Sequence, residues 1–108
     1  MCYNEEQFVS ETIDNIIKQK TDDMTLVVSD NNSTDKTREI LERKLANLPN
    51  TTLVNRNNNI GALESFNELC SQVDTEFLIF AGSHDLWGPN YLKTLLNYIY
   101  NNLYRRQY

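Results

Sequence analysis

The spacing of apolar residues changes repeatedly along this chain, and this alternation limits the folds that it can adopt. Segments at 5–20, near 36–48, near 61–73 and from 89 to about 103 carry apolar residues at helical spacing. Three shorter segments lie between them, at 24–28, 51–54 and 77–80, and are apolar or β-branched at consecutive positions. That pattern is typical of strands buried on both faces. We therefore expect helices and strands in strict alternation.

The short connections between these segments predict how the strands pair. Strands separated by helices pair in parallel, through right-handed crossovers. The sequence thus predicts an α/β fold, in which helices cover a Rossmann-like, mostly parallel sheet within a single domain over residues 1–108. We expect Asn4 to cap the first helix, with Gln7 completing the capping box. Pro49 should stop the second helix, and Pro89 should begin the fourth.

A polar cluster follows each predicted strand. Residues 30–35 (DNNSTD), 55–61 (NRNNNIG) and 82–85 (GSHD) come directly after the three strands. The carboxyl ends of parallel strands meet at one edge of an open α/β sheet, and such folds bind their ligands at that edge. Connections at the opposite edge, near 20–23, 49–50 and 74–76, have the composition of plain turns. This asymmetry predicts a small-molecule site at the carboxyl edge.

Two of these clusters also have a purely structural interpretation. Residues 30–35 could form only a turn and a helix cap at Ser33 or Thr34; alternatively, Asp30 accepts a hydrogen bond from a base or a ribose. Residues 55–61 could form a solvated loop that ends in a left-handed glycine; alternatively, Arg56 pairs with a phosphate. The sequence leaves both alternatives open.

The third cluster contains His84, which is the only histidine of the chain. A single histidine in a loop is most often structural. With the carboxylate of Asp85 beside it, the imidazole could instead begin a Mn²⁺ or Mg²⁺ site that diphosphate oxygens and water complete. We therefore treat both residues as candidate metal ligands.

The bulk composition excludes several classes of partner. A net charge of −5 argues against a nucleic-acid partner. No apolar run approaches the ~20 residues of a membrane span, and the polar start is unlike a signal peptide, so we expect a cytoplasmic protein. Cys2 and Cys70 lie too far apart for metal-ligand spacing. We expect both as reduced thiols, with Cys70 in the core.

Taken in order, these motifs resemble the large, family 2-like group of inverting glycosyltransferases with the GT-A fold. The matching motifs are CYNEE at 2–6, DNNSTD at 30–35, the set Asn59, Gly61 and Asn67, and GSHDLWGP at 82–89. The resemblance covers nearly the whole chain. It implies the nucleotide-sugar-binding part of an enzyme that transfers a sugar from a nucleoside diphosphate to an acceptor hydroxyl, in polysaccharide or glycolipid synthesis.

The resemblance also implies roles for individual residues. Tyr3 would flank the base, and Asp30 would hydrogen-bond it with Asn31 as its neighbour. His84 and Asp85 would hold a Mn²⁺ or Mg²⁺ ion that neutralises charge on the leaving diphosphate. The other residues expected at the nucleotide are Asn4, Glu5, Gly61, Asn67 and Ser83.

Departures from the family pattern qualify these expectations. The family places carboxylates where this chain has Gly82 and His84, so the metal site is either a variant or weakened. The family's first strand would precede Met1, and its acceptor region with the catalytic carboxylate would follow Tyr108. We therefore expect a truncated domain that is poorly active alone and has an unpaired sheet edge through which it could associate.

The sequence also bears on three other classes of protein. A non-catalytic, degenerate nucleotide-sugar-binding domain is the main alternative, because the metal motif is eroded. A receiver-like signalling domain with Asp30 as phosphoacceptor would need an acidic pair and a later lysine, and neither is visible. A dinucleotide dehydrogenase would need a Gly-x-Gly-x-x-Gly turn, which the three glycines of this chain do not form.

Overall fold

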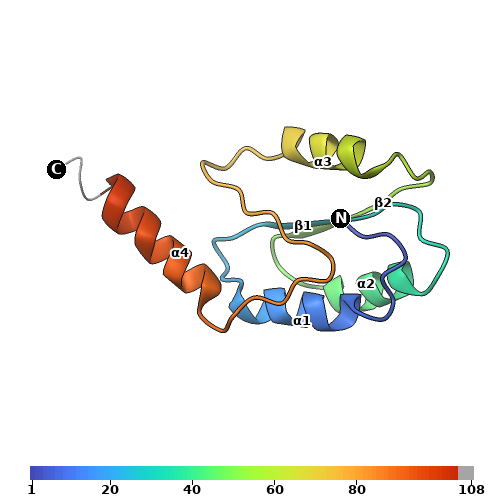
Figure 1. Cartoon of the computed structure of the whole chain (residues 1–108), viewed down its shortest axis with the longest axis horizontal. Coiled ribbons are helices and arrows are strands. Elements are labelled where there is room, and N and C mark those ends of the chain that lie inside the picture. Colours follow the sequence, from blue (N-terminus) through green and yellow to red (C-terminus); the bar gives the residue numbers. More distant parts are fainter. Residues whose placement is uncertain (105–108) are drawn as a thin grey trace.

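The computed structural model describes residues 1–104 and shows an α/β arrangement around a small parallel sheet (Figure 1). The last four residues of the domain expected at 1–108 lie outside the described part. The elements, in chain order, are α1 (Val9–Gln19), β1 (Leu26–Asp30), α2 (Thr37–Leu45), β2 (Thr51–Asn55), α3 (Ala62–Ser71), α4 (Tyr91–Ile99) and a terminal π-helical turn, η1 (Tyr100–Tyr104).

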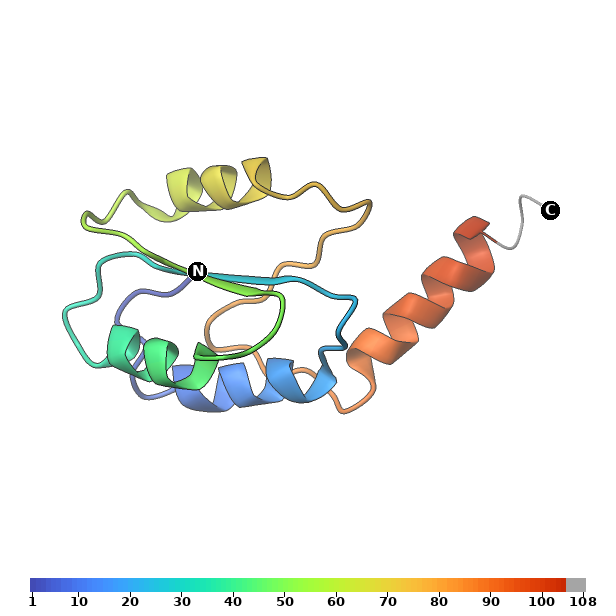
Figure 2. The same cartoon turned by 180° about the vertical axis from the view of Figure 1, so that it is seen from behind.

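The sheet contains β1 and β2, which pair in parallel from Leu26 opposite Thr51 to Asp30 opposite Asn55. On its other side, β1 is joined to the start of the chain by a single parallel bridge between Cys2 and Asp30. Helices α1 and α2 cover one face of the sheet and α3 covers the opposite face, as two opposed views show (Figures 1 and 2). Helix α4 projects away from this body, which makes the molecule 51 Å long.

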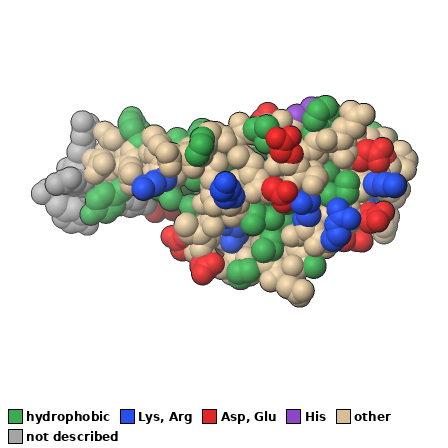
Figure 3. Space-filling model, turned by 90° about the horizontal axis from the view of Figure 1, so that it is seen from below, with side chains coloured by type: hydrophobic (Ala, Val, Ile, Leu, Met, Phe, Trp, Pro, Cys, Tyr) green, Lys and Arg blue, Asp and Glu red, His purple; other side chains and the backbone are tan. Residues whose placement is uncertain are grey.

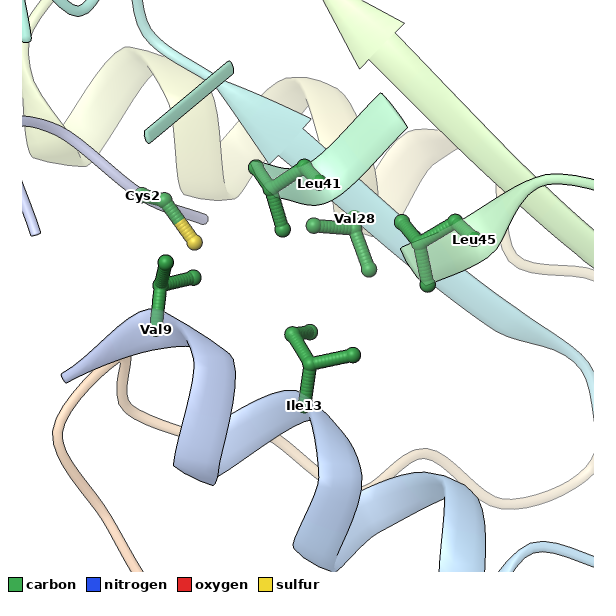
Figure 4. Close-up of a cluster of buried hydrophobic side chains, with 6 residues drawn as sticks. All are labelled: Cys2, Val9, Ile13, Val28, Leu41 and Leu45. Carbon is green, nitrogen blue, oxygen red and sulfur yellow. The ribbon is translucent and has the colours of Figure 1, made fainter. Parts of the chain in front are cut away.

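The core lies between β1 and the two helices of the lower layer. Side chains from the first segment, α1, β1 and α2 point toward one another there (Figure 4). Full burial of one such aliphatic side chain contributes about 1.5–3 kcal/mol. The members of this cluster are Cys2, Val9, Ile13, Val28, Leu41 and Leu45.

Helix α1 begins later than predicted, because the expected cap is used elsewhere. The helix starts at Val9, and the residue before it, Phe8, makes no side-chain cap bond. Asn4 has a left-handed backbone (φ 51°), and its side chain accepts a hydrogen bond from the Thr34 amide. The predicted capping box from Asn4 to Gln7 is therefore wrong.

Helix α2 also differs at both ends. It begins at Thr37 and ends at Leu45, before the predicted stop at Pro49, and Asn47 just beyond has a left-handed backbone (φ 63°). Neither Ser33 nor Thr34 caps it. Instead, the Asp35 carboxylate accepts a bond of 2.9 Å from the Thr37 amide.

The predicted third strand at 77–80 is not a strand among the described residues, so the sheet is smaller than expected. All four side chains, Phe77, Leu78, Ile79 and Phe80, are exposed by 38–53%. A strand is defined by its ladder of hydrogen bonds to a neighbour, and β1 and β2 pair with each other instead. The prediction of a strand at 77–80 is therefore wrong for the part of the chain that the structure describes.

Two smaller predictions also need correction. Helix α4 begins at Tyr91 rather than at Pro89, and Cys70 on α3 is half-buried rather than in the core. Cys2 and Cys70 are free thiols, as expected. Within residues 1–104, no helix has the length and apolar character needed to cross a bilayer.

Candidate functional site

The loop at residues 2–6 is tied to the loop that follows β1. The Asn4 amide donates to Ser33 Oγ (3.0 Å), and the Thr34 amide donates to Asn4 Oδ1 (2.8 Å). One residue on, the Glu5 amide donates to Thr37 Oγ1 (2.7 Å). These bonds hold the CYNEE and DNNSTDKT motifs together in the folded chain.

Glu6 and Asp35 extend this link to the start of α2. The Glu6 amide donates to Asp35 Oδ2, and the Lys36 amide donates to Glu6 Oε2, each over 3.2 Å. Two carboxylates therefore already occupy the amide groups at the N-terminus of α2. Since anions favour such termini, this helix start is filled by the protein itself.

Asp30 lies at the end of β1 and is fully buried. Its carboxylate accepts from the Ser33 amide (3.1 Å) and Ser33 Oγ (2.5 Å), and it pairs with Arg38 Nε at 3.0 Å. The turn of the structural interpretation is thus present, without the Ser33 or Thr34 cap. The expected contact between Asp30 and a base stays a prediction, and the side chain now also has a structural role.

Asn31 connects the loop after β1 to the loop after β2. Its Nδ2 donates to Asn59 Oδ1 (2.9 Å), and its Oδ1 accepts from the Ile60 amide (3.0 Å). Asn59 Oδ1 also accepts from the Gly61 amide (2.8 Å). Gly61 has φ +83°, a conformation that L side chains rarely adopt, and it directly precedes α3. Two strand-end loops are therefore held together at one edge, as the sequence predicts.

The segment at 82–85 reaches the same region through α1 and Glu5. Ser83 O accepts from Thr12 Oγ1 of α1 (3.0 Å). The imidazole of His84 pairs through Nε2 with Glu5 Oε1, and its ring stacks on Phe8 with the centroids 5.1 Å apart. His84 thus links this segment to the loop at 2–6.

The two candidate metal ligands point to different partners. His84 faces Glu5, whereas Asp85 Oδ2 accepts from the Gly82 amide (3.1 Å) within its own turn. A Cβ at Gly82 would lie 2.6 Å from that carboxylate oxygen. Among the described residues, no group of three His, Cys, Asp or Glu side chains could hold a metal ion. In this arrangement the residues present do not fit a metal site.

The remaining candidate residues differ in their exposure and in their contacts with the linked loops. Tyr3 is exposed by 44% beside Asn4, so its ring is available to a ligand. Asn67 lies exposed on α3, and within residues 1–104 no recorded hydrogen bond joins its side chain to the loops. Arg56, considered for a phosphate, pairs instead with Glu68 of α3, Nη1 to Oε2, over 2.8 Å.

Two titratable groups near the site are perturbed. Burial, the largest effect, together with the nearby Asp30 and Glu5 carboxylates, raises the pKa of the Cys2 thiol, although the N-terminal amine acts in the opposite direction. Partial burial of Asp35 would raise the pKa of that carboxyl, but hydrogen bonds from Thr37 and the Glu6 amide outweigh it and lower the pKa. The pKa shifts therefore favour the neutral thiol at Cys2 and the ionised carboxylate at Asp35.

Two contributors were missed at the level of sequence. Arg38 neutralises Asp30 from the first turn of α2, and Asn59 holds both Asn31 and Gly61. The eight-residue separation of Asp30 from Arg38 is visible in the sequence, but only the turn at 30–35 brings the two together.

Comparison with known proteins identifies the family of this chain. Residues 1–105 match Glycosyl transferase family 2. The chain belongs to glycosyl transferase family 2. Its members commonly use a divalent metal ion. The predicted resemblance is thereby confirmed.

The relatives that this chain matches are longer than the chain itself. The dTDP-rhamnosyl transferase RfbG of Shigella flexneri is 31% identical over 106 residues, which cover 93% of this chain and 37% of the relative. The S. aureus TarS 1–349 structure superposes with a TM-score of 0.80 at 28% identity, over 93% of this chain and 30% of TarS. TarS 1–349 has also been solved with UDP and with UDP-GlcNAc. The chain therefore spans about a third of the length of these relatives.

Proposed function

We propose that this chain binds a nucleoside diphosphate sugar at the carboxyl edge of β1 and β2, as the donor-binding part of a glycosyltransferase. The observation that carries the proposal is the pair of links made by Asn4 and Asn31. Asn4 joins the loop at 2–6 to residues 33–34 of the loop after β1. Asn31, in that second loop, joins it to residues 59–60 of the loop after β2. Three polar loops thus meet at the edge where α/β sheets bind ligands.

The diphosphate is expected near α3 rather than α2. Asp35 and Glu6 already fill the amide groups at the start of α2, and a second anion there would be repelled. Helix α3 starts after Gly61 with no side-chain cap bond, so its first amides remain available. We accordingly assign the base to the vicinity of Tyr3, Asp30 and Asn31, and the diphosphate to the side of Gly61.

A pyrimidine nucleotide is the donor class that the relatives favour. RfbG is named for dTDP and TarS has been crystallised with UDP, and both nucleotides carry a pyrimidine base. Since both relatives are about 30% identical to this chain over most of its length, we propose UDP or dTDP as the nucleotide. We propose no particular sugar or acceptor. A role of the whole protein in polysaccharide or glycolipid synthesis stays a prediction.

Transfer needs a carboxylate to deprotonate the acceptor hydroxyl, and the described carboxylates nearest the edge are engaged. Glu5 pairs with His84, Asp30 with Arg38, and Asp85 with the Gly82 amide. We therefore propose donor binding, with little or no turnover, for these 108 residues by themselves. The first strand and acceptor region expected from the resemblance stay predictions.

Thermal stabilisation of the isolated chain tests the proposal. A ligand that binds only the folded state adds about 2.7 kcal/mol at a hundredfold excess over its Kd. We expect UDP or dTDP to raise the Tm and GDP to raise it less. An unchanged Tm with all three nucleotides, with and without Mn²⁺, would defeat the donor-binding claim.

A second function, a binding domain without catalysis in any context, is favoured by one observation. At the two positions where the family pattern has metal-binding carboxylates, this chain has Gly82 and His84. The imidazole of His84 also pairs with the Glu5 carboxylate. His84→Asp, which keeps Gly82, should then create a Mn²⁺-dependent gain in UDP binding that the natural chain lacks. If the natural chain already shows that dependence, this second candidate loses its support.

A further inference from the structure

A pocket with a volume of about 480 Å³ lies between α1 and α4. It is lined by the second half of α1, the turn that precedes β1, the segment at 87–90 and the first turns of α4. Two of its lining residues, Thr21 and Met24, precede β1 and so lie at the edge of the sheet opposite the polar loops assigned to the donor. Cavities of this size are typical of small-molecule sites. The pocket is therefore a candidate ligand site separate from the donor site.

Two side-chain amides of α1 hold one wall of this pocket in place. Asn15 Nδ2 donates to Trp87 O (3.0 Å), and the Trp87 amide donates to Asn15 Oδ1 (2.8 Å). One turn further along α1, Gln19 Nε2 donates to Gly88 O (2.9 Å), and Gln19 Oε1 accepts from the Leu92 amide (3.2 Å). Each side chain thus uses both its donor and its acceptor on the backbone that leads into α4. The wall that carries Trp87 is therefore formed before any ligand binds.

Apolar side chains form one part of the lining. Trp87 is half-buried, and its ring packs against Tyr91 with the centroids 5.0 Å apart and the planes at 40°. Met24 and Leu96 also line the pocket, and Leu96 is 44% exposed. The indole N–H of Trp87 has no protein partner within residues 1–104. This surface can therefore take an apolar group and offers one hydrogen-bond donor beside it.

The charged side chains of the lining all have the same sign. Lys18 of α1 and Lys93 of α4 line the pocket, and no carboxylate is among its described lining residues. The whole chain has 15 acidic and 10 basic side chains, so this local sign is opposite to the net charge of −5. Basic side chains lie on the projecting part of the molecule and where it meets the body (Figure 3). Within residues 1–104 no ion pair engages either lysine, so both are available to an anion.

We propose that this pocket binds a small amphiphilic anion. The apolar part of the ligand lies against Trp87 and Leu96, and its anionic group pairs with Lys18 and Lys93. The two kinds of lining select this class together. A neutral sugar gains no ion pair from the lysines, and an inorganic anion leaves the apolar surface in water. The proposal does not rest on nucleotide binding at the polar edge.

Intrinsic fluorescence tests the proposal, because Trp87 is the only tryptophan of the chain. The probe is octyl phosphate at submicellar concentration, titrated into the 108-residue chain. We expect a saturable change in the Trp87 emission. Neutral octyl glucoside, cationic octyltrimethylammonium and inorganic phosphate should each give a weaker change or none. No saturable change with octyl phosphate, or an equal change with any of the other three, would overturn the proposal.

Lysine variants locate the anionic group. Lys18→Gln and Lys93→Gln should each raise the Kd for octyl phosphate about two- to fivefold, the range expected for one exposed ion pair. Lys36→Gln is the matched control, because it removes the same charge from an exposed lysine outside the pocket, and it should leave the Kd unchanged. Trp87 also lines a second, apolar pocket beside β1, which contains neither Lys18 nor Lys93. A Kd that both lysine variants leave unchanged would therefore contradict the assigned site.

Chain length and salt measure the two parts of the contact separately. Hexyl phosphate has two CH₂ groups fewer than octyl phosphate, and its Kd should be higher by about fourfold or more. Higher ionic strength should weaken both ligands to a similar extent, because screening acts on the phosphate that they share. Equal Kd values for the two ligands would contradict the apolar contact. A Kd that does not depend on salt would contradict the pairing with Lys18 and Lys93.

Vesicles of phosphatidylglycerol distinguish a free molecule from a lipid headgroup as the source of the anion. A response to octyl phosphate without one to vesicles assigns a free small molecule, and a response to both assigns a headgroup at a membrane surface. A response to vesicles alone would contradict a discrete pocket. Excess UDP should not displace octyl phosphate, and displacement would show that the pocket belongs to the donor site. Loss of octyl phosphate binding leaves the Tm response to UDP unaffected, so the two proposals fail separately.

Discussion

His84 pairs with Glu5 through Nε2 and Oε1, and its ring stacks on Phe8. This contact joins the segment at 82–85 to the loop at 2–6. It also occupies the imidazole that the sequence offered as a metal ligand.

The pair predicts that His84→Ala and Glu5→Gln act through the same interaction. His84 is 57% exposed, so the coupling free energy from a double-mutant cycle should be below about 1 kcal/mol. Denaturant titration of the two single variants and the double variant measures it. If His84 instead binds metal, His84→Ala would remove only the Mn²⁺-dependent part of a nucleotide-induced Tm shift, and Glu5→Gln would not.

Arg38→Met is expected to lower the free energy of unfolding by about 2–3 kcal/mol, because it leaves the buried Asp30 carboxylate without its cation. Lys44→Met is the matched control. It breaks a pair of similar length, 2.8 Å to Asp14, whose carboxylate is 62% exposed, so its cost should be below about 1 kcal/mol. If urea titrations gave the two variants the same loss of unfolding free energy, burial of Asp30 would not determine the cost of removing its cation.

Gly61→Ala should destabilise the chain by about 1–3 kcal/mol through backbone strain, because φ is +83° there. No atom lies within 4 Å of the added Cβ, so steric contact is not the cause. Gly88→Ala also meets no atom within 4 Å and serves as the control. Gly61→Ala should in addition weaken UDP binding, because Gly61 sets the start of α3. If Gly61→Ala had the same Tm as Gly88→Ala, the positive φ of Gly61 would not cause backbone strain in the variant.

The lowered pKa of Asp35 predicts a pH dependence of stability. A carboxyl whose pKa is depressed in the folded state stabilises it above the ordinary value of about 3.9, and this contribution is lost as the pH falls through the folded-state pKa. Asp35→Asn keeps an acceptor for Thr37 but does not titrate, so its unfolding free energy should fall less steeply below about pH 4. Asp22→Asn, in an exposed turn, is the control and should keep the steepness of the natural chain.

The helices were largely predictable because their apolar residues recur on one face. Val9, Ile13 and Leu41 lie in the core, as their spacing requires. The predicted starts of the helices were less accurate. The polar residues that could have capped the helices bind residues of other loops instead, as Asn4 binds Thr34. Capping motifs describe local geometry, and they fail where a distant segment competes for the same side chain.

The strand at 77–80 was the main error of the fold prediction, and its cause is tertiary. The segment has the composition of a buried strand, but among the described residues the sheet contains only β1 and β2. The gathering of polar loops at one edge was predictable from their positions after strands. The contacts that hold them there, such as Asn31 to Asn59, depend on loop conformations that the sequence does not specify.

The central claim is that the linked loops at the carboxyl edge bind a pyrimidine nucleoside diphosphate. Amide chemical-shift mapping by NMR during a UDP titration tests it most directly. The account predicts saturable shifts for the amides of Asn31, Ile60 and Gly61, with little change in the turn at 20–23 on the opposite edge. Shifts confined to the opposite edge, or no saturable shifts at millimolar UDP, would contradict it.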